Sequence, residues 1–363
     1  MDDHLDDLYD RLMARMDAFP LGAPRSENLR GILTLIFTPE QAQLALDMEE
    51  RPEELSELAT RLGREPAELE AMLESMADTG TAYCRERNGN KWYSLLPLVP
   101  GIFELQFMKA EVNPEKRRIA ELFDAYYFEG WGEANFSAGR TPLTRVLPVQ
   151  QEIPRKDQVL PYEQVSQYIK DSTYMALTHC FCRHEAELLG RSCGAPKDVC
   201  MCFGPFAEFL VKRGFAWKAS TAEMMAALDK AEKAGLVHIT DNIQDKIGFI
   251  CNCCGCCCGF LGTITKLHLE GTIATSRYVA ALDPDLCNGC DICVQTCQLK
   301  AITLDTDEVA SVDAARCIGC GICASHCPSE AMSMTERATQ PEPKPTFMDL
   351  GMAILSERGK SGK

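Results

Sequence analysis

Apolar residues recur at helical spacing through the first part of the chain. This periodicity predicts amphipathic helices over residues 1–19, 27–37, 51–62 and 66–77. From residue 81 to 96 the apolar and polar positions alternate instead, as they do in strands. The alternation is interrupted at Asn88-Gly89, a pair that favours the two-residue turn of a β-hairpin. The chain therefore begins with helices and continues into a hairpin.

Three helices followed by a hairpin resemble a winged helix over residues 27–97, so residues 1–98 are predicted to form a winged-helix-like domain. The third helix would enter a DNA major groove, yet residues 66–78 carry four acidic side chains and no basic one. Residues 1–98 hold ten Lys or Arg against twenty Asp or Glu. Phosphate binding needs the opposite sign. We interpret this domain as a protein-docking or structural module, which could also support a homo-oligomer.

The pattern from residue 99 to 175 predicts a helical connector and linker. A helix is expected over residues 114–130, an extended linker over 147–161 with its three prolines, and a short helix over 162–170. The aromatic residues Tyr126, Tyr127 and Trp131 are interpreted as core. No catalytic pattern is found in this region.

The remaining chain predicts three further regions. Residues 176–280 are expected to form a cysteine-rich α+β domain around a helix over 221–233 and a hairpin over 236–250. Residues 281–335 form a second cysteine-rich unit, and 336–363 a linker and tail with a short helix over 347–355. The predicted fold class is therefore α+β and multidomain.

The chain has twenty cysteines among its 363 residues, and these indicate a chemical function in addition to a packed core. The N-terminus is acidic and lacks the features of a secretory signal, and no apolar run is long enough to span a bilayer. We therefore expect a cytoplasmic protein without a membrane span. In such a chain many cysteines indicate metal ligands instead of disulfides. So many oxygen-sensitive thiolates favour an anaerobic or microaerobic host.

The net charge of −16 and the isoelectric point near 4.9 bear on possible partners. A strongly acidic surface disfavours nucleic acid and anionic membrane, and it suits docking to a basic patch on a redox protein. Solubility alone would explain the same charge equally well.

Two cysteine runs with one spacing lie near the end of the chain. Each follows the Cys-x2-Cys-x2-Cys-x3-Cys pattern that holds cubane iron–sulfur clusters through thiolates. Residues 281–335 resemble the bacterial-type two-[4Fe-4S] ferredoxin module. The resemblance implies that one cluster is held by Cys287, Cys290, Cys293 and Cys327, and the other by Cys317, Cys320, Cys323 and Cys297. A pair of zinc knuckles is the alternative.

One position departs from the ferredoxin pattern. Pro328 follows the last cysteine of the second run, but Gln298 stands where the first run would have its proline. Ligation is unaffected by this change. The local backbone and the reduction potential of one cluster are the properties it puts in question.

A second group of cysteines lies upstream in two pieces. The predicted metal ligands there are Cys180, Cys182, Cys193, Cys200, Cys202, Cys251, Cys253, Cys254, Cys256, Cys257 and Cys258. Six cysteines in the eight residues 251–258 cannot all pair as disulfides with good geometry, so metal or sulfide ligation is the physical reason for such a run. The helix and hairpin between the two pieces are expected to bring them together.

Three interpretations of these thiols remain open. The first is one or two additional [4Fe-4S] clusters, held by Cys182, Cys193 and Cys200 with part of the 251–258 run. The second is a non-cubane cluster that shares adjacent thiolates, because Cys253-Cys254-Gly255 and Cys257-Cys258-Gly259 resemble the Cys-Cys-Gly motifs of heterodisulfide reductases. The third is a metallothionein-like zinc or copper site.

Arg183 and His184 directly follow Cys182. An arginine beside a cluster would raise its potential or bind an anionic substrate, and the histidine could act as a ligand or proton donor. An ordinary helix start at the surface explains both residues as well.

The sequence predicts an iron–sulfur electron-transfer protein that passes electrons between a redox partner and a second metal centre in residues 176–268. The order of its domains resembles [4Fe-4S]-binding proteins of anaerobes. One alternative is a cluster-containing reductase of a disulfide or other sulfur compound, and another is a redox-sensing transcriptional regulator. Glycine-rich nucleotide-binding motifs are absent from the sequence.

Overall fold

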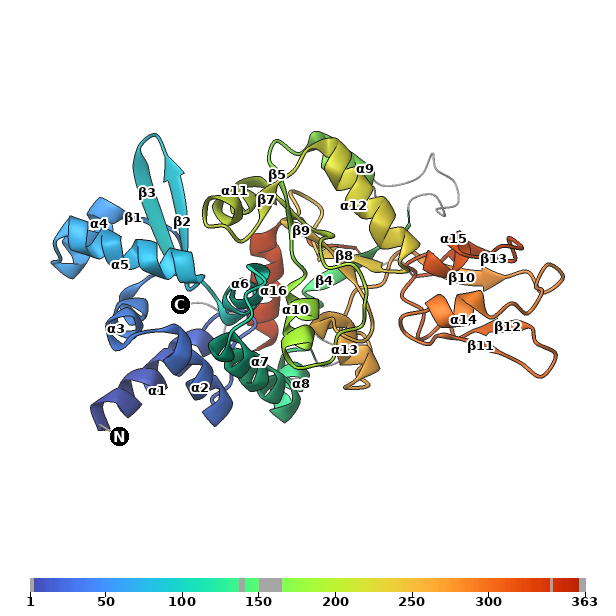
Figure 1. Ribbon diagram of the computed structural model, residues 1–363, viewed down its shortest axis with the longest axis horizontal. Helices are drawn as coiled ribbons and strands as arrows, with labels where there is room; N and C mark the ends of the chain where they lie inside the picture. Colours follow the sequence, from blue (N-terminus) through green and yellow to red (C-terminus); the bar gives the residue numbers. More distant parts are fainter. Residues whose placement is uncertain (1–2, 137–140, 150–164, 340–341, 359–363) are drawn as a thin grey trace.

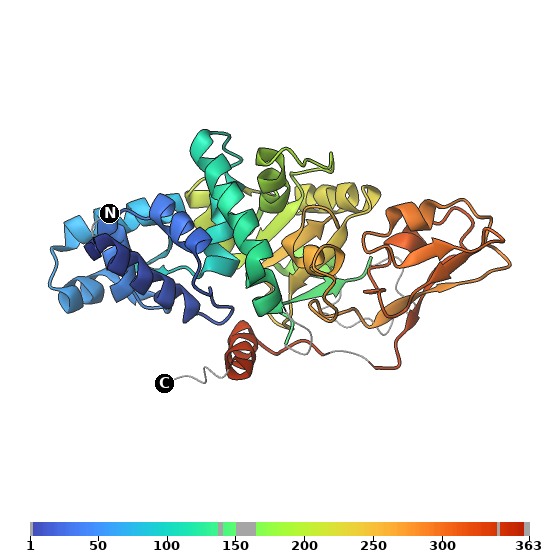
Figure 2. The ribbon, with the colours of Figure 1, turned by 90° about the horizontal axis from the view of Figure 1, so that it is seen from below.

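The computed structural model of the chain describes residues 3–136, 141–149, 165–339 and 342–358. Figure 1 shows three regions in a row along the longest axis of the molecule. N-terminal helices and a hairpin lie at one end, a sheet with its helices lies in the middle, and a small unit of short strands lies at the other end. Figure 2 gives the same order from below.

The N-terminal region contains five helices and a small sheet. The helices are α1 (Asp3–Asp17), α2 (Glu27–Ile36), α3 (Pro39–Asp47), α4 (Leu55–Leu62) and α5 (Pro66–Thr79), and the strands are β1 (Glu53–Glu54), β2 (Ala82–Arg87) and β3 (Asn90–Leu95). The sheet order is β1-β3-β2 and all pairs are antiparallel. Asn88 and Gly89 both have positive φ, as the predicted two-residue turn requires.

Two features of this region differ from the sequence prediction. Helix α3 was not expected, although Thr38 and Gln41 form a capping box and Pro39 occupies its first turn. The helix predicted from residue 51 starts only at Leu55, because Glu53 and Glu54 extend to pair with β3. The assignment to the winged-helix class stays a prediction.

A six-stranded antiparallel sheet organises the middle of the molecule, in the order β4-β8-β9-β6-β5-β7. Its strands are β4 (Thr144–Leu147), β5 (Met175–Thr178), β6 (Cys200–Phe203), β7 (Trp217–Lys218), β8 (Val237–Asp241) and β9 (Phe249–Cys253). The predicted hairpin over 236–250 is present as β8 and β9, but β9 continues into the cysteine run as far as Cys253. This continuation fixes two of the cysteines on a rigid strand.

Helices surround this sheet. They are α6 (Phe103–Met108), α7 (Pro114–Tyr126), α8 (Gly132–Phe136), α9 (Val165–Asp171), α10 (Phe181–Leu188), α11 (Gly204–Lys212), α12 (Thr221–Lys233) and α13 (Gly259–Thr265), with irregular turns η1 (Leu98–Ile102) and η2 (Tyr127–Trp131). Ser220 caps α12 with a capping box. The predicted helix over 114–130 ends at Tyr126, since Gly130 adopts a positive φ in the following turn. Most of the predicted linker over 147–161 lies outside the described residues.

The C-terminal unit is built from short strands and the two cysteine runs. Its elements are β10 (Tyr278–Leu282), α14 (Ile292–Thr296), β11 (Ile302–Leu304), β12 (Ala310–Val312), α15 (Ile322–Ser325) and β13 (Met332–Glu336). Strands β10 and β13 pair antiparallel, as do β11 and β12. Helix α16 (Phe347–Glu357) then returns to the N-terminal region, where Arg358 binds Asp17 and the carbonyl of Phe19.

The apolar cores show how the regions are joined. One continuous core runs from Tyr9 to Ile354 through the N-terminal and middle regions, and the C-terminal unit has a core of its own. Two cysteines of the C-terminal unit, Cys297 and Cys320, also pack against the main core. In the described ranges, no helix is both long and apolar enough to cross a membrane.

Glu74 on α5 joins the N-terminal region to the middle region, and it should make stability sensitive to acid. It accepts hydrogen bonds from Arg213, at 2.8 Å, and from Lys91 and Tyr93. Burial alone would raise the pKa of Glu74, but these hydrogen bonds outweigh it and lower the pKa to about 2. The stabilisation is therefore present at neutral pH and is lost as the pH falls from about 4.5 towards 2.

We expect Glu74→Gln to lower the free energy of unfolding by about 1–3 kcal/mol at pH 7. The difference from the natural chain should shrink below pH 3, as measured by urea unfolding across this range. A difference that stays constant down to pH 2.5 would contradict this role for Glu74.

Candidate metal centres

The sheet brings the two cysteine pieces of the middle region together. Strands β6 and β9 are antiparallel neighbours with Met201 opposite Ile250, so Cys200, just before Met201, and Cys251, just after Ile250, lie side by side on the two strands. Cys251 and Cys253 are two residues apart on β9 and therefore point to one face of the sheet. The expectation that the helix and hairpin would assemble the two pieces agrees with this geometry.

Six buried thiols form a connected set that we call the six-thiol centre. Its members are Cys180, Cys182, Cys200, Cys251, Cys253 and Cys258. Their thiols interact in a chain: Cys180 with Cys200, Cys200 with Cys251, Cys251 with Cys253, Cys253 with Cys258, and Cys258 with Cys182. Five of the six also surround one small cavity, together with Phe181, Arg183 and Phe260. Thiols arranged around a space suit a polynuclear cluster.

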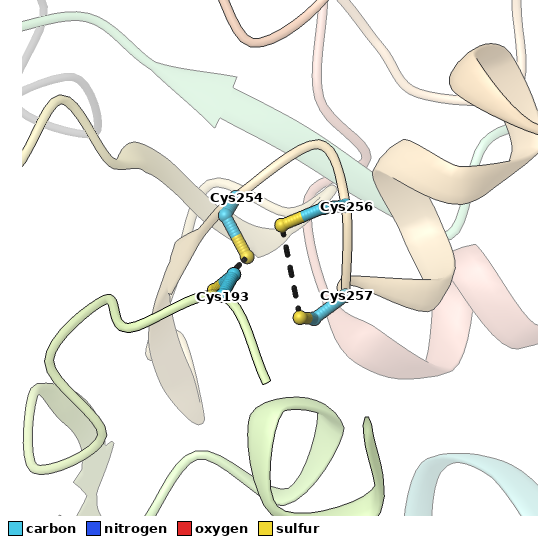
Figure 3. Close-up of side chains that lie close together, drawn as sticks. All are labelled: Cys193, Cys254, Cys256 and Cys257. Atoms are coloured by element: carbon cyan, nitrogen blue, oxygen red, sulfur yellow. Dashed lines mark hydrogen bonds between the residues drawn. The ribbon is translucent and has the colours of Figure 1, made fainter. Parts of the chain in front are cut away.

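Four other thiols form a compact group that we call the four-thiol site. Cys193, Cys254, Cys256 and Cys257 have their sulfur atoms all within 4.8 Å of one another. Figure 3 shows the four side chains pointing toward one another, with Cys193 on one loop and the other three on the loop after β9. The closest pairs are Cys193–Cys254 at 3.8 Å and Cys256–Cys257 at 3.7 Å.

These sulfur–sulfur distances fit ligands of a single tetrahedral ion. Metal–sulfur bonds of about 2.3 Å in a tetrahedron place the sulfur atoms about 3.8 Å apart. A cubane holds its thiolates on four different irons and so needs them farther apart. Among the described residues, neither set of ferredoxin cysteines forms such a compact group. The four-thiol site therefore matches one iron or zinc ion better than a cubane.

Adjacent cysteines are divided between the two middle sites. Cys253 belongs to the six-thiol centre and Cys254 to the four-thiol site, and Cys258 and Cys257 are divided in the same way. The cause at the first pair is the end of β9, where successive side chains point to opposite faces. Cys256 and Cys257, by contrast, are adjacent and both belong to the four-thiol site, so the non-cubane interpretation stays a prediction. The structure also places Cys193 apart from Cys182 and Cys200.

Arg183 lies between the two groups of thiols, and its surroundings indicate whether these thiols suit an anionic metal centre. Its side chain is buried, and Nη1 donates to the carbonyl oxygen of Asn252 at 2.9 Å and lies 3.9 Å from Cys254 Sγ. Within the described residues, Arg183 Nε and Nη2 are buried without a hydrogen-bond partner. A buried guanidinium with unused donors needs an anion, and thiolate-bound iron and sulfide would supply it.

The pKa values of the middle thiols also indicate metal binding. A hydrogen bond from Cys257 lowers the pKa of Cys254 to about 4. Cys180 and Cys251 likewise lower the pKa of Cys200, and Cys182 and Cys253 that of Cys258. The pKa values of their partner thiols are raised instead. Each group therefore ionises only in part by itself, and full thiolate ligation requires the positive charge of metal ions.

The eight cysteines of the C-terminal unit gather into two sets. Cys287, Cys290, Cys293 and Cys327 surround one small cavity, which we call the distal set. Cys297, Cys317, Cys320 and Cys323 interact electrostatically with one another, and we call them the proximal set. This is the grouping that the ferredoxin resemblance implies. The backbone N–H of Ala301 donates to Cys297 Sγ at 3.3 Å, an interaction that raises cluster potentials.

Gln298, the residue that departs from the ferredoxin pattern, joins the proximal set to the middle region. Its Nε2 donates to the carbonyl oxygen of Gly235, and its Oε1 accepts from the N–H of Gly255, both at 2.8 Å. Gly255 lies between Cys254 and Cys256 of the four-thiol site. A Cβ atom at Gly255 would lie 2.2 Å from the carbonyl oxygen of Gln298. A proline at position 298 would lack both side-chain hydrogen bonds.

The other candidate residues lie outside these groups. Cys202 is buried beside the six-thiol centre, where burial raises the pKa of its thiol. Cys84 lies in the N-terminal hairpin. His184 is buried, with Nε2 2.9 Å from the carbonyl oxygen of Glu111 and Nδ1 3.3 Å from Glu187. Both ring nitrogens of His184 therefore have partners outside the groups of thiols.

Three acidic residues near the thiols were missed by sequence reasoning. Burial raises the pKa of Glu104 to about 7 and that of Asp241 to about 6, and both line a cavity beside Cys200 and Cys251. Burial and the nearby Asp124 raise the pKa of Glu185 to about 8, beside Cys182 and Cys256. The connector helix α6 carries Glu104, so this region does contribute to the site. The one signal for Glu104 in the sequence is that it is the single charged residue within the apolar run 102–108.

Comparison with known families supports an iron–sulfur chemistry for the C-terminal unit. Residues 280–334 match the family model of the 4Fe-4S dicluster domain. This is an iron–sulfur protein. The match covers the C-terminal unit alone, and neither a curated protein nor a solved structure matches the chain. A dicluster domain indicates electron transfer in general, and the clustered thiols of the middle region support further metal binding.

A substitution within the four-thiol site should remove one metal ion. We expect Cys256→Ser to lower the metal content of the anaerobic iron–sulfur protein by about one ion per chain, because a tetrahedral ion would lose one of its four ligands. Elemental analysis for iron and zinc measures this change and identifies the metal. Cys202→Ser is the control, since Cys202 lies outside both groups, and it should keep the full content. Loss of four irons on Cys256→Ser would show a cubane at this site instead.

Proposed function

We propose that this protein transfers electrons between a redox partner and a metal centre in its middle region, with the C-terminal unit connecting the two. The observation that carries the proposal is the Gln298 contact. Through it, the residue after Cys297 binds the backbone between two cysteines of the four-thiol site. Electron transfer falls off steeply with distance, and this hydrogen bond keeps the chain segments that carry the two groups of thiols close together.

The residues fit the cofactors that this function needs. The distal and proximal sets would each hold one [4Fe-4S] cluster, the six-thiol centre a further cluster, and the four-thiol site a single ion. When bound, these groups supply one-electron redox chemistry. The chain itself holds them at fixed separations, excludes water from the six-thiol centre, and places the Arg183 charge between the two middle sites.

The distal set is the proposed docking point for the partner. Cys290 is exposed, and Leu286 and Ile292 beside it are exposed apolar side chains. Acidic residues at Asp283, Asp285 and Asp291 flank them. An apolar centre with an acidic rim suits a redox protein that presents a basic rim. Such a partner would approach the one set of cluster ligands that faces away from the main core.

We infer that the N-terminal region is structural or holds a protein partner. Glu74 and Asp78 of the acidic helix α5 bind Arg213 of the middle region. A helix used in this way, with four acidic side chains, does not suit the DNA major groove. An anaerobic shift assay at low salt tests the regulator alternative, for which binding of DNA would be required.

A second candidate function is reduction of a small molecule at the six-thiol centre. The observation that favours it is the cavity beside Cys200 and Cys251. In that case the C-terminal unit supplies the electrons, and the middle region is the place where they are used.

The test of electron transfer removes the proximal set. In Cys297→Ser, the middle region should keep its metal, but its buried six-thiol centre should be reduced at least about tenfold more slowly by viologen coupled to dextran, which is too large to approach buried thiols. Cys84→Ser is the control. Iron analysis and stopped-flow absorption measure loading and rate. Equal rates in both variants, with the middle region loaded, would overturn the proposal.

A further inference from the structure

A cavity of about 310 Å³ lies beside the six-thiol centre. Cys200 and Cys251 of that centre line it, as does Cys202. Its volume falls at the lower end of the range of small-molecule sites, which is about 300–1,000 Å³. A molecule in this cavity would therefore lie directly against two of the six thiols.

The wall of the cavity is mostly apolar. It includes Leu105 and Met108 from α6, Met201 from β6, Phe249 from β9, and Phe181 and Phe206 from the starts of two helices. These side chains come from several elements, so the cavity has a fixed shape that packing of the core maintains. An apolar frame of a ligand would gain most of its affinity from this wall.

Two carboxyl groups provide the polar part of the site. Glu104 accepts a hydrogen bond from the N–H of Gly101, and Asp241 accepts one from the N–H of Gly248, each at 2.7 Å. Both side chains are buried and line the cavity. A few fixed polar groups in an apolar wall are the usual means by which a pocket orients its ligand.

The cavity reaches the surface between two exposed residues. Lys246 and Phe347 line it and are exposed, whereas the thiols and carboxyl groups within it are buried. Phe347 is the first residue of α16, and its side chain is 52% exposed. A small molecule could therefore enter without passing through the main core.

We propose that this cavity binds a small uncharged molecule with an apolar, ring-sized frame and one hydrogen-bonding group, placed against Cys200 and Cys251. The inference rests on the proposed function for its purpose, because the bound molecule would be the one that exchanges electrons with the middle region. The groups that line the cavity determine which charge its ligand can carry. Either ion would lose its hydration against an apolar wall, and burial favours the protonated form of both carboxyl groups, which then offer a cation no charge in exchange.

Three probes of one frame test the class of ligand. They are 2-naphthol, 2-naphthoate and 2-naphthylmethylammonium, which are neutral, anionic and cationic. We expect calorimetry on the anaerobic holoprotein at pH 6 to show binding of 2-naphthol at least about tenfold tighter than that of either ion. Tighter binding of either ion, or no binding of 2-naphthol, would overturn the proposal.

Two further variants test the location. Leu143→Trp and Met108→Trp should each weaken 2-naphthol binding at least about tenfold by filling the cavity, and Ile354→Trp, which changes a buried residue outside the cavity lining, should not. Unchanged iron content and absorption spectrum identify the variants that are folded. Undiminished binding in both folded cavity variants would place the ligand elsewhere. Electron transfer into the middle region is measured separately, so the proposed function can hold even if all three probes fail to bind.

Discussion

Replacing Arg183 by Met should strip iron from the middle region and leave the C-terminal clusters in place. The guanidinium is buried beside Cys254 and has two nitrogen atoms without partners among the described residues. Removing one partner of a buried charge interaction costs about 3–5 kcal/mol. We therefore expect middle-region iron to be lost to a chelator at least about a hundredfold faster than in the natural chain.

The conservative variant and a surface control sharpen this experiment. Arg183→Lys keeps the positive charge but loses the planar fork of donors, so it should restore part of the retention. Arg118→Met removes an exposed arginine of α7 and should change nothing. In Arg183→Met protein that still holds middle-region iron, the midpoint potential should be lower, since a nearby cation favours the reduced state. Retention and potential equal to those of the natural chain would show that Arg183 faces no anionic centre.

Substitution of Gly255 by Ala should slow electron transfer between the C-terminal unit and the middle region. A Cβ atom at this position would meet the carbonyl oxygen of Gln298 at 2.2 Å, which is far inside contact distance. The two surfaces would have to separate, and the hydrogen bond between Gly255 and Gln298 would be lost. We expect the rate to fall at least about tenfold, measured by stopped-flow reduction through the distal set.

Gly259, the first residue of α13, offers a matched control. A Cβ atom at Gly259 would meet nothing within 4 Å, so Gly259→Ala should transfer electrons at the natural rate. Gln298→Pro restores the ferredoxin pattern and removes both side-chain hydrogen bonds, so it should be slow, like Gly255→Ala. If Gly255→Ala and Gly259→Ala transfer electrons at the same rate while both retain full iron, electron transfer does not depend on the contact between Gly255 and Gln298.

Much of the local structure could be predicted because its causes are local. Alternation and Asn88-Gly89 gave the first hairpin, and Ser220 with Glu223 marks the start of α12. Helix α3 has equally local signals in Thr38 and Pro39, which the apolar periodicity alone did not reveal. Cysteine spacing likewise identified the C-terminal unit, which the dicluster family model matches.

The division of the middle thiols could not be predicted from spacing. Whether Cys253 and Cys254 share a centre depends on where β9 ends, and the strand continues farther into the cysteine run than the alternation indicated. Cys193 reaches the four-thiol site from a distant loop, and Glu104 reaches the cavity from a region without recognisable chemistry. Tertiary contacts also decide the role of Gln298, because the sequence shows only that a proline is missing.

We infer that the middle thiols hold redox-active iron, which receives its electrons through the C-terminal unit. Mössbauer spectroscopy on anaerobic protein loaded with ⁵⁷Fe, before and after reduction, tests this inference most directly. We predict more than the eight irons of two [4Fe-4S] clusters, with iron beyond those eight changing its oxidation state on reduction. Eight irons per chain, with no signal beyond the two cubanes, would contradict it.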